Sequence, residues 1–519
     1  MITEDQSEVV AFLESPSTHG GAEVERVDTH SAVVFLAGSL AYKLKRAVRY
    51  DYLDFSTADR RREMCEAEVR LNRRTAPALY QGVVPVTRGA AGALALGGEG
   101  TPVDWLVVMN RFRQEALFDR LAAERRMELE LMPPLAEAIA ALHAEAEPRP
   151  ESGGAPGMAW VIDGNEAGFA EFGAGVLDPA ACRRVTERAR AEVDAWRDVL
   201  EERRAAGYVR QCHGDLHLRN VVLLDGRPTL FDAVEFNDRI ACIDVLYDLA
   251  FLLMDLWRRD LPRHANTVWN AYLRETDELR GIGLLPLFLS CRAAVRAKTS
   301  ATAARLNDDA GRRAELEELA RGYLVMAEEL LEPPPPCLVA VGGFSGSGKS
   351  TLALGLAPSL GAVPGAVVAR SDEIRKRLCG ASPLERLGPE AYTAEVSERV
   401  YATIAERARA ALRAGHAVVA DAVFARPSER EAIERVAAAA RVPFVGLWLE
   451  APPETLVARV EARRDDASDA DAAVVRMQLR RGAGALTWRR LDASTSSEAL
   501  LEHARERVRE EAPASLPLG

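Results

Sequence analysis

The string GFSGSGKS, which runs from Gly343 to Ser350, matches the phosphate-binding pattern GxxxxGK(S/T) in full. It follows an apolar run, CLVAVG, and opens a predicted helix, which is the context that phosphate binding requires. Glycines at these positions allow backbone amides to close around phosphate oxygens at the start of a helix. Lys349 is then expected to reach the β- and γ-phosphates, and the Ser350 hydroxyl to bind Mg2+. The residues predicted to bind a nucleoside triphosphate here are Gly343, Ser345, Gly346, Ser347, Gly348, Lys349, Ser350 and Thr351.

Charged residues downstream of this loop could complete a phosphoryl-transfer site. Asp372 ends the second predicted strand in RSDEIRKRL, where an acceptor would meet the γ-phosphate. Two interpretations stay open: a carboxylate that receives the acceptor's proton, with Arg375 one turn on to hold the acceptor, or a helix N-cap. Asp421, at the end of VVAD, is predicted to hold Mg2+ through water. Arg459 and Arg463 are candidates for a lid over the phosphates, or else for a solvated helix face.

A second set of residues with catalytic spacing lies in the first half of the chain, in CHGDLHLRN. Asp215 is followed five residues later by Asn220, as in the kinase catalytic loop HRDxxxxN. In that loop the aspartate accepts the proton of the acceptor hydroxyl and the asparagine holds magnesium. A predicted hairpin, VVLL, DGRP and TLF, then delivers Asp232, where a kinase places its second magnesium-binding carboxylate.

Such a site needs a lysine for the nucleotide phosphates and a helix glutamate that orients the lysine. The segment LAYKLKR offers Lys43 and Lys45, which are two apart and therefore on one face of a strand. Lys43 matches the last position of the VAIK pattern and is our choice, although Lys45 stays open. Glu68, in CEAEVRLNRR, is the expected helix partner, whereas Glu66 would point elsewhere. No GxGxxG loop precedes this segment, so the nucleotide lid is unspecified.

The elements that must position these residues divide at four consecutive prolines, 333–336, which cannot continue the preceding helical pattern. We predict one domain over residues 1–332, a proline linker over 333–336 and a second domain over 337–519. After the linker, short apolar runs alternate with amphipathic stretches, which predicts an α/β domain with a parallel sheet. Before it, strand patterns over 22–48 and a mostly helical remainder predict a small β-rich lobe and a larger helical lobe.

Composition restricts the kinds of protein this could be. The formal net charge of −12 argues against a broad nucleic-acid footprint, so a nucleic-acid partner is not expected. Seven scattered cysteines without CxxC pairs fit a reducing compartment and neither a zinc site nor a disulfide framework. No secretory signal and no apolar window of about 20 residues is seen, so we expect a cytoplasmic protein without membrane contact. The oligomeric state is open.

These motifs resemble two known families. Through HGDLHLRN, FDAVEFND and IDVLYDLAFL, the first half resembles the aminoglycoside phosphotransferase and choline kinase branch of the protein-kinase-like fold. His217 is typical of that branch, and Asp244 with Asp248 matches its acidic pair, which would brace the catalytic loop or else serve as helix caps and surface charge. Through GFSGSGKST, RSDEIRKRL and VVADAVF, the second half resembles small P-loop kinases of the gluconate kinase, chloramphenicol phosphotransferase and zeta-toxin group.

As a whole, the chain resembles the bifunctional aminoglycoside phosphotransferase and ATP-binding protein family. The resemblance implies an α+β, protein-kinase-like bilobal domain joined to an α/β P-loop kinase domain, with ATP and Mg2+ as cofactors. It implies phosphoryl transfer to the hydroxyl group of a small molecule. Two alternatives stay open: one active kinase with a nucleotide-sensing second domain, or a P-loop half that is a polynucleotide kinase or nucleic-acid-stimulated ATPase.

Overall fold

The computed structural model describes residues 2–382, 385–462 and 468–515. It divides into two compact units, each of which is described by itself. The first unit comprises Met1–Gly164 and Arg190–Asp255, and the second comprises Asn165–Ala189 and Leu256–Gly519. Residues 256–332 therefore group with the P-loop half in this division, and the domain limit at 333–336 stays a prediction.

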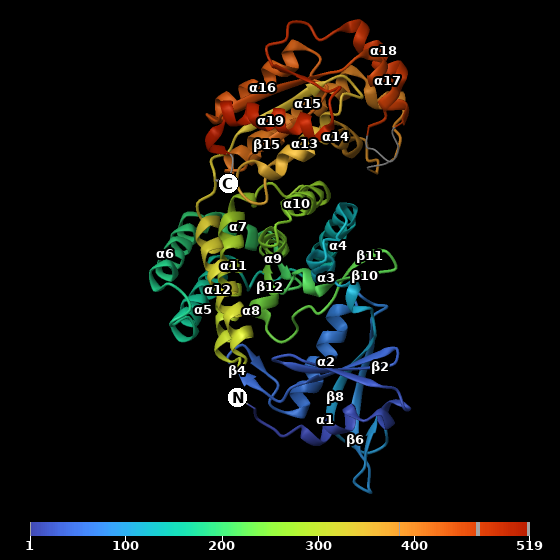
Figure 1. Ribbon diagram of the computed structural model, residues 1–519, viewed down its shortest axis with the longest axis vertical. Helices are drawn as coiled ribbons and strands as arrows, with labels where there is room; N and C mark the ends of the chain where they lie inside the picture. The colour runs from blue at the N-terminus through green and yellow to red at the C-terminus, as the bar shows by residue number, and fades with distance from the viewer. Residues whose placement is uncertain (1, 383–384, 463–467, 516–519) are drawn as a thin grey trace. The chain divides into compact units, whose positions relative to one another are not determined.

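The small lobe of the first unit is built on a six-stranded antiparallel sheet of order β1-β2-β3-β8-β6-β7 (Figure 1). Its strands are covered on both faces, so alternate side chains enter different cores. Leu36 and Val107 pack with helix α2, while Phe35 and Leu106 pack with helix α1. The bounds are α1 (Ser7–Glu14), β1 (Val24–Asp28), β2 (Ala32–Ala37), β3 (Leu40–Lys45), α2 (Ala58–Asn72), β6 (Tyr80–Arg88), β7 (Leu94–Leu96) and β8 (Thr101–Asn110), with a short hairpin of β4 (Arg49–Tyr50) and β5 (Leu53–Asp54).

Two short ribbons and the buried helix α9 support residues 212–220 of the first unit, which the sequence predicts to be a catalytic loop. Strands β10 and β11 form the hairpin predicted after Asn220, and its turn places both Asp225 and Gly226 at positive φ, as a tight Asp-Gly turn requires. Strand β9 pairs with β12 just before α9 begins. The bounds are α3 (Phe118–Ala123), α4 (Met132–Glu145), α5 (Gly154–Phe172), α6 (Pro179–Ala195), α7 (Arg197–Ala205), β9 (Val209–Gln211), β10 (Val221–Leu224), β11 (Arg227–Leu230), α8 (Asp238–Ala241), β12 (Cys242–Asp244) and α9 (Val245–Arg258).

The second unit contains a five-stranded sheet of order β14-β15-β13-β16-β17, in which every neighbouring pair is parallel. Its central strands β13 and β15 are buried along their whole length, which explains their continuous apolar sequences. The bounds are α10 (Pro262–Thr276), α11 (Leu285–Arg305), α12 (Ala310–Leu330), β13 (Leu338–Gly343), α13 (Lys349–Leu356), β14 (Val367–Arg370), α14 (Ser371–Leu378), α15 (Ala394–Arg413), β15 (Val418–Asp421), α16 (Pro427–Ala440), β16 (Phe444–Glu450), α17 (Pro453–Ala462), α18 (Ala472–Arg481), β17 (Arg489–Asp492) and α19 (Ser497–Glu511).

Helix α10 packs beside the edge strand of this sheet. The Asn270 side chain accepts a hydrogen bond from Val368 N at 2.7 Å and donates to the Ala366 carbonyl at 3.2 Å. Asn266, one turn earlier, donates to the carbonyls of Pro364 and Ala366 at 3.1 Å each. The backbone leading into β14 is thus held by side chains that precede the prolines in sequence.

The fold class predicted from the sequence is confirmed. The first half carries a kinase-like antiparallel sheet and the C-terminal part carries a parallel sheet of the P-loop type. In the described part of the chain, no helix is long and apolar enough to cross a membrane. The seven cysteines all lie among the described residues, and none of them is joined in a disulfide.

Candidate functional site

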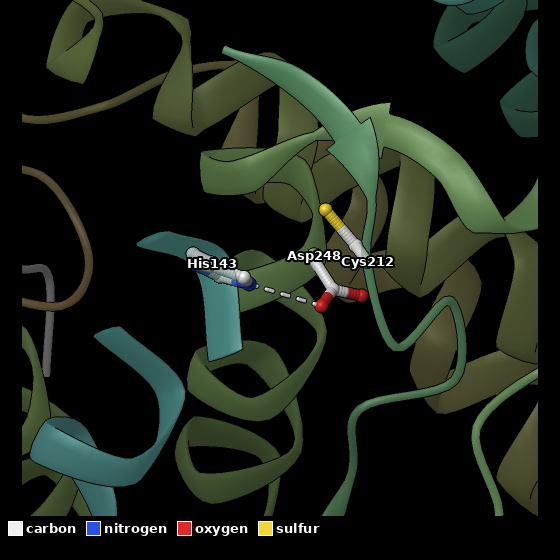
Figure 2. A group of neighbouring side chains, drawn as sticks. All are labelled: His143, Cys212 and Asp248. Carbon is white, nitrogen blue, oxygen red and sulfur yellow. Dashed lines mark hydrogen bonds and ion pairs between the residues drawn. The ribbon is translucent and has the colours of Figure 1, made fainter. Parts of the chain in front are cut away.

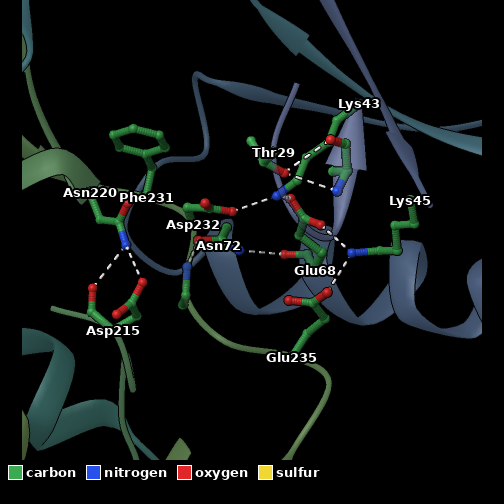
Figure 3. A network of polar contacts seen from close by, with 12 residues as sticks. Thr29, Lys43, Lys45, Glu68, Asn72, Asp215, Asn220, Phe231, Asp232 and Glu235 are labelled. Carbon is green, nitrogen blue, oxygen red and sulfur yellow. Dashed lines mark hydrogen bonds and ion pairs between the residues drawn. The ribbon is translucent and has the colours of Figure 1, made fainter. Parts of the chain in front are cut away.

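The first candidate site begins where β3 faces α2. Lys43 Nζ lies 2.8 Å from Glu68 Oε1, and Lys45 Nζ lies 2.6 Å from Glu68 Oε2 (Figure 3). The two lysines therefore share one face of the strand, as their spacing predicted. Glu66 lies on the exposed side of α2 and pairs with Arg62, so it takes no part in this cluster. Burial opposes ionisation of Glu68, but the two lysines outweigh it and lower its pKa to about 2.

Asp232 joins this cluster from the segment that follows the β10–β11 hairpin. Lys43 Nζ lies 2.6 Å from Asp232 Oδ1, whereas Lys45 pairs with Glu235. Asp232 adopts a positive φ of 62°, and its amide donates to the Tyr80 hydroxyl at 3.1 Å. Lys43 is thus the lysine that reaches the predicted magnesium-binding carboxylate, which supports our choice of Lys43 over Lys45.

The catalytic loop presents Asp215 with its side chain held from two directions. Asn220 Nδ2 donates to Asp215 Oδ2 at 3.1 Å and to the Asp215 carbonyl at 2.8 Å. His217 Nε2 lies 3.3 Å from the same carboxylate oxygen, while its Nδ1 accepts from Arg219 N at 3.3 Å. The carboxylates of Asp215 and Asp232 are each 42% exposed, whereas Asn220 and His217 are largely buried. A ligand can therefore meet both carboxylates.

His213 links the catalytic loop to the segment that carries Asp232. Burial lowers its pKa, so the imidazole is neutral; Nε2 donates to the Phe231 carbonyl at 2.9 Å. Its Nδ1 then accepts from Asp215 N at 3.4 Å, and its carbonyl accepts from Val234 N at 2.9 Å. This histidine fixes the spacing between the two predicted functional aspartates.

Asp248 accepts hydrogen bonds from the backbone of the same loop. Its Oδ1 accepts from Gly214 N at 2.8 Å, and its Oδ2 accepts from His213 N at 3.1 Å and from His143 Nε2 at 3.1 Å. Asp248 is fully buried, so the bracing interpretation describes it and the surface-charge interpretation does not. Asp244 instead forms a paired contact with Arg203, at 2.7 and 2.8 Å, and accepts from Leu246 N at the start of α9.

His143, Cys212 and Asp248 form the group shown in Figure 2, whose ligand-type atoms lie within 4.8 Å of one another. Both oxygens of Asp248 already accept backbone amides, and Cys212 Sγ donates to the Ile243 carbonyl at 3.4 Å. Burial raises the pKa of the Cys212 thiol well above its ordinary value, which opposes the thiolate that a metal requires. We therefore interpret this group as a loop brace.

Two residues of this first site escaped the sequence analysis. Asp255, on α9, accepts from Leu218 N at 3.1 Å, and Glu235 pairs with Lys45. Both are acidic residues at helix or loop positions that resemble surface charge in sequence. The sequence signals were weak: Glu235 lies in FDAVEFND, and Asp255 follows Asp248 by seven residues.

The donor set of the first site fits Mg2+. Asp232 offers a partly exposed carboxylate, and Asn220 offers an amide whose nitrogen is turned toward Asp215. Hard oxygen donors of these kinds are the ligands that Mg2+ prefers. Asn220 and Asp232 are therefore the residues that would hold it.

The second candidate site is the loop between β13 and α13. Gly343, Gly346 and Gly348 all have positive φ, at 143°, 84° and 87°. A Cβ on Gly346 would lie 2.4 Å from the Leu456 carbonyl oxygen, so only glycine fits there. Lys349 Nζ donates to the Phe344 carbonyl at 3.1 Å within the loop. Strand, loop and helix stand in the order that the motif predicted.

Asp421 is brought to this loop by β15, the strand next to β13. Ser350 Oγ donates to Asp421 Oδ2 at 2.6 Å, so the two predicted magnesium-binding residues are in direct contact. Burial raises the pKa of Asp421, and the nearby charges of Arg370 and Lys349 offset this rise only in part. A hydroxyl and a carboxylate oxygen fit a magnesium ion, and they are the residues of this site that would hold it.

Asp372 lies in the first turn of α14 and not at the end of β14, which stops at Arg370. The N-cap residue of α14 is Arg370, so the capping interpretation of Asp372 is wrong. A carboxylate in the first turn of a helix is favoured by the helix dipole. Arg375 is buried and donates to the Ala391 carbonyl at 2.6 Å, with its guanidinium 4.9 Å from the Tyr392 ring centre. Its partner in the structure is therefore the segment before α15.

The predicted lid is described in part. Arg459 is exposed on α17, and Arg463 lies outside the described residues. Beyond the undescribed stretch, Asp469 accepts from the Tyr392 hydroxyl at 2.7 Å and from Leu387 N at 3.2 Å. Lys376 Nζ, on the buried side of α14, lies 3.6 Å from Asp469 Oδ1. These contacts connect α14 and the segment around Tyr392 with the chain that leads into α18.

Comparison with known proteins finds a family model that matches part of each half. The phosphotransferase enzyme family matches residues 42–282, and the AAA domain family matches residues 338–484. An uncharacterized protein of Mycobacterium tuberculosis is 29% identical over 508 residues, covering 94% of this chain and 97% of that protein. The predicted combination of a phosphotransferase-type domain with a P-loop domain is confirmed.

Two further similarities concern single halves. Adenylyl-sulfate kinase of Myxococcus xanthus is 34% identical over 117 residues, which cover 22% of this chain and 59% of that enzyme. The crystal structure of a choline/ethanolamine kinase family protein from Mesorhizobium loti is 16% identical, with a TM-score of 0.38. It covers 62% of this chain and 99% of that chain.

Proposed function

We propose that this chain, which joins a phosphotransferase-family domain to a P-loop domain, is an ATP-dependent kinase that phosphorylates hydroxyl groups of small molecules at two sites. The observation that carries the proposal is the pair of clusters described above. Lys43, Glu68 and Asp232 meet beside Asp215, and Ser350 meets Asp421 under the P-loop. Each cluster supplies the parts that phosphoryl transfer needs, namely phosphate-binding cations, magnesium ligands and, at the first site, a carboxylate for the acceptor proton.

At the first site, Asp215 receives the proton of the acceptor hydroxyl while His217 and Asn220 keep its carboxylate in place. Lys43 binds nucleotide phosphates and is kept charged and oriented by Glu68. Mg2+, when bound, neutralises charge that develops on the transferred phosphate. The residues thus act by position and charge, and no covalent intermediate is needed.

At the second site, backbone amides of the P-loop and Lys349 bind the phosphates, and Ser350 with Asp421 would hold Mg2+. Asp372 is our candidate for the carboxylate that receives the acceptor proton, because it opens α14 close to the strand ends. Arg375 then serves the acceptor indirectly, by fixing the segment around Ala391.

The acceptors are proposed to be small hydroxylated metabolites such as sugars and amino sugars. For the P-loop half, the similarity to an adenylyl-sulfate kinase supports a small acceptor and adds nucleotide-like compounds such as adenylyl sulfate. Free cysteines, six of them buried, support a reducing, cytoplasmic location.

Two alternatives carry different expectations. If one half only senses nucleotide, it binds ATP without phosphorylating any acceptor. If the P-loop half acts on nucleic acid, binding to single-stranded DNA weakens steeply with salt, a behaviour that the net charge of −12 disfavours.

A metabolite extract incubated with Mg-ATP and full-length protein tests the proposal by mass spectrometry. Asp215→Asn should abolish one set of phosphorylated products and Lys349→Ala another. If neither variant loses any product of the unaltered protein, both site assignments are wrong. If one variant alone loses products, the other half is a nucleotide sensor.

A further inference from the structure

Five charged side chains of the first site form an unbroken chain of four ion pairs, and the backbone between Asp232 and Glu235 closes this chain into a ring (Figure 3). Lys43 joins Glu68 to Asp232, and Lys45 joins the other oxygen of Glu68 to Glu235. Asp232 and Glu235 are three residues apart on one segment, so the ring runs from that segment through β3 and α2 and back. A kinase-type lysine and glutamate pair accounts for only half of it.

The two halves of the ring differ in their access to solvent. The side chains of Lys43 and Asp232 are 15% and 42% exposed, so a ligand can reach them. The side chains of Lys45 and Glu235 are 2% and 5% exposed, and Glu68 is fully buried. The Lys45 ammonium also lies 4.9 Å from the centre of the Phe55 ring. Lys45 and Glu235 are therefore closed off from any nucleotide.

Nucleotide binding at this site would involve the open half of the ring. The Lys43 ammonium must turn to phosphate oxygens, and the Asp232 carboxylate must become a magnesium ligand, so their contact cannot persist unchanged. The segment that carries Asp232 would then keep one side-chain link to β3 within the ring, which is the contact between Glu235 and Lys45.

We propose that Lys45 and Glu235 are a positioning pair that holds the Asp232 segment against β3 while Lys43 and Asp232 engage nucleotide and Mg2+. Lys45 at the same time neutralises the Glu68 oxygen that Lys43 does not contact. The pair touches no reacting atom. This inference rests on the proposed function of the first site.

Calorimetric titration of full-length protein with a non-hydrolysable ATP analogue, with and without Mg2+, tests the proposal. All variants carry Lys349→Ala, which silences the P-loop. Glu235→Gln should leave nucleotide affinity without Mg2+ within about 2-fold, because the pair is remote from the phosphates. The Mg2+ concentration for half-saturation should rise by about 10-fold or more, as is usual when groups that orient a metal ligand are removed.

Glu66→Gln is the matched control, since Glu66 lies on the exposed face of the same helix. Lys45→Met combined with Glu235→Gln removes both charges together and leaves Glu68 paired with Lys43 alone, so it serves if the single variant does not fold. Equal Mg2+ dependence in Glu66→Gln and in a folded Glu235→Gln or double variant overturns the proposal. So does an equal loss of nucleotide affinity with and without Mg2+.

Lys43→Met separates this inference from the function on which it rests. It should weaken nucleotide binding strongly in both conditions. If Lys43→Met binds nucleotide like its parent, the proposed function of the first site is wrong, whatever Glu235→Gln does.

Discussion

Replacing Asp248 by asparagine should loosen the catalytic loop without disturbing the rest of the first unit. The Asp248 carboxylate accepts two backbone amides of the loop, from His213 and Gly214, and one ring nitrogen, from His143. An asparagine keeps one oxygen and turns an NH2 group toward at least one of these donors. A buried donor without an acceptor costs about 1–3 kcal/mol, and loss of the negative charge weakens the remaining bond by about 1 kcal/mol.

The sum, about 2–4 kcal/mol, corresponds to a fall on the order of 100-fold in the protection of the loop amides against hydrogen exchange. Exchange read by mass spectrometry on peptides that cover 212–220 measures it locally, which suits a chain of two units that need not unfold together. Products that depend on Asp215 should decline in parallel, because the loop presents this carboxylate.

Asp238→Asn is the matched control, since Asp238 is exposed at the start of α8 in the same unit. It should leave protection of the loop unchanged. If Asp248→Asn folds and its loop amides stay within about 3-fold of the unaltered protein, Asp248 does not brace the loop and the interpretation of this buried group fails.

Three further predictions concern charge and backbone shape. The pKa of Glu68 is about 2 when folded against 4.5 in its ordinary state, so it adds stability above pH 4.5 that is lost as pH falls toward 2. Glu68→Gln should remove this pH dependence, worth about 3 kcal/mol, in hydrogen exchange of β3 and α2 compared at each pH. Burial raises the folded pKa of Asp421, so its ionisation destabilises the second unit as pH rises above the ordinary 3.8. Without nucleotide at pH 8, Asp421→Asn should therefore have a higher melting temperature than the unaltered protein, and this difference should shrink toward acid pH. Mg-ATP should raise the melting temperature of the variant only a little. A lower melting temperature of the variant at pH 8 would contradict this. Gly346→Ala should abolish nucleotide binding to the P-loop, because the added Cβ meets a backbone oxygen. The Cβ of Gly348→Ala meets no atom within 4 Å, so this variant should lose only about 1–2 kcal/mol of stability to its positive φ. Equal effects of both variants on nucleotide binding would refute the steric argument.

Local spacing explains why much of the first site could be predicted from sequence. Asp215 and Asn220 lie within one short loop, and Lys43 and Lys45 lie on one strand, so their relative placement follows from a few backbone angles. A hairpin with an Asp-Gly turn fixes the distance from that loop to Asp232. The structure brings these residues together as expected.

Residues whose partners are remote in sequence could not be predicted in this way. Glu235 contacts a lysine 190 positions earlier, and no periodicity near either residue indicates the other. Arg375 lies on the predicted helix, but its direction depends on how the segment around Ala391 packs. The place of Asp372 was missed by two residues because strand ends are set by sheet pairing, which a single sequence does not specify.

The asparagines of α10 have a consequence for how the P-loop half can be handled as a separate protein. Strand β14 is an edge strand, and Asn270 offers its backbone one acceptor and one donor, as a neighbouring strand would. A fragment cut at the prolines would lose this cover and present open hydrogen-bonding groups to other molecules, which favours association edge to edge. A fragment that begins before Pro262 keeps α10 over the edge of β14. This helix, which precedes the prolines in sequence, should therefore keep the P-loop half soluble as a separate protein.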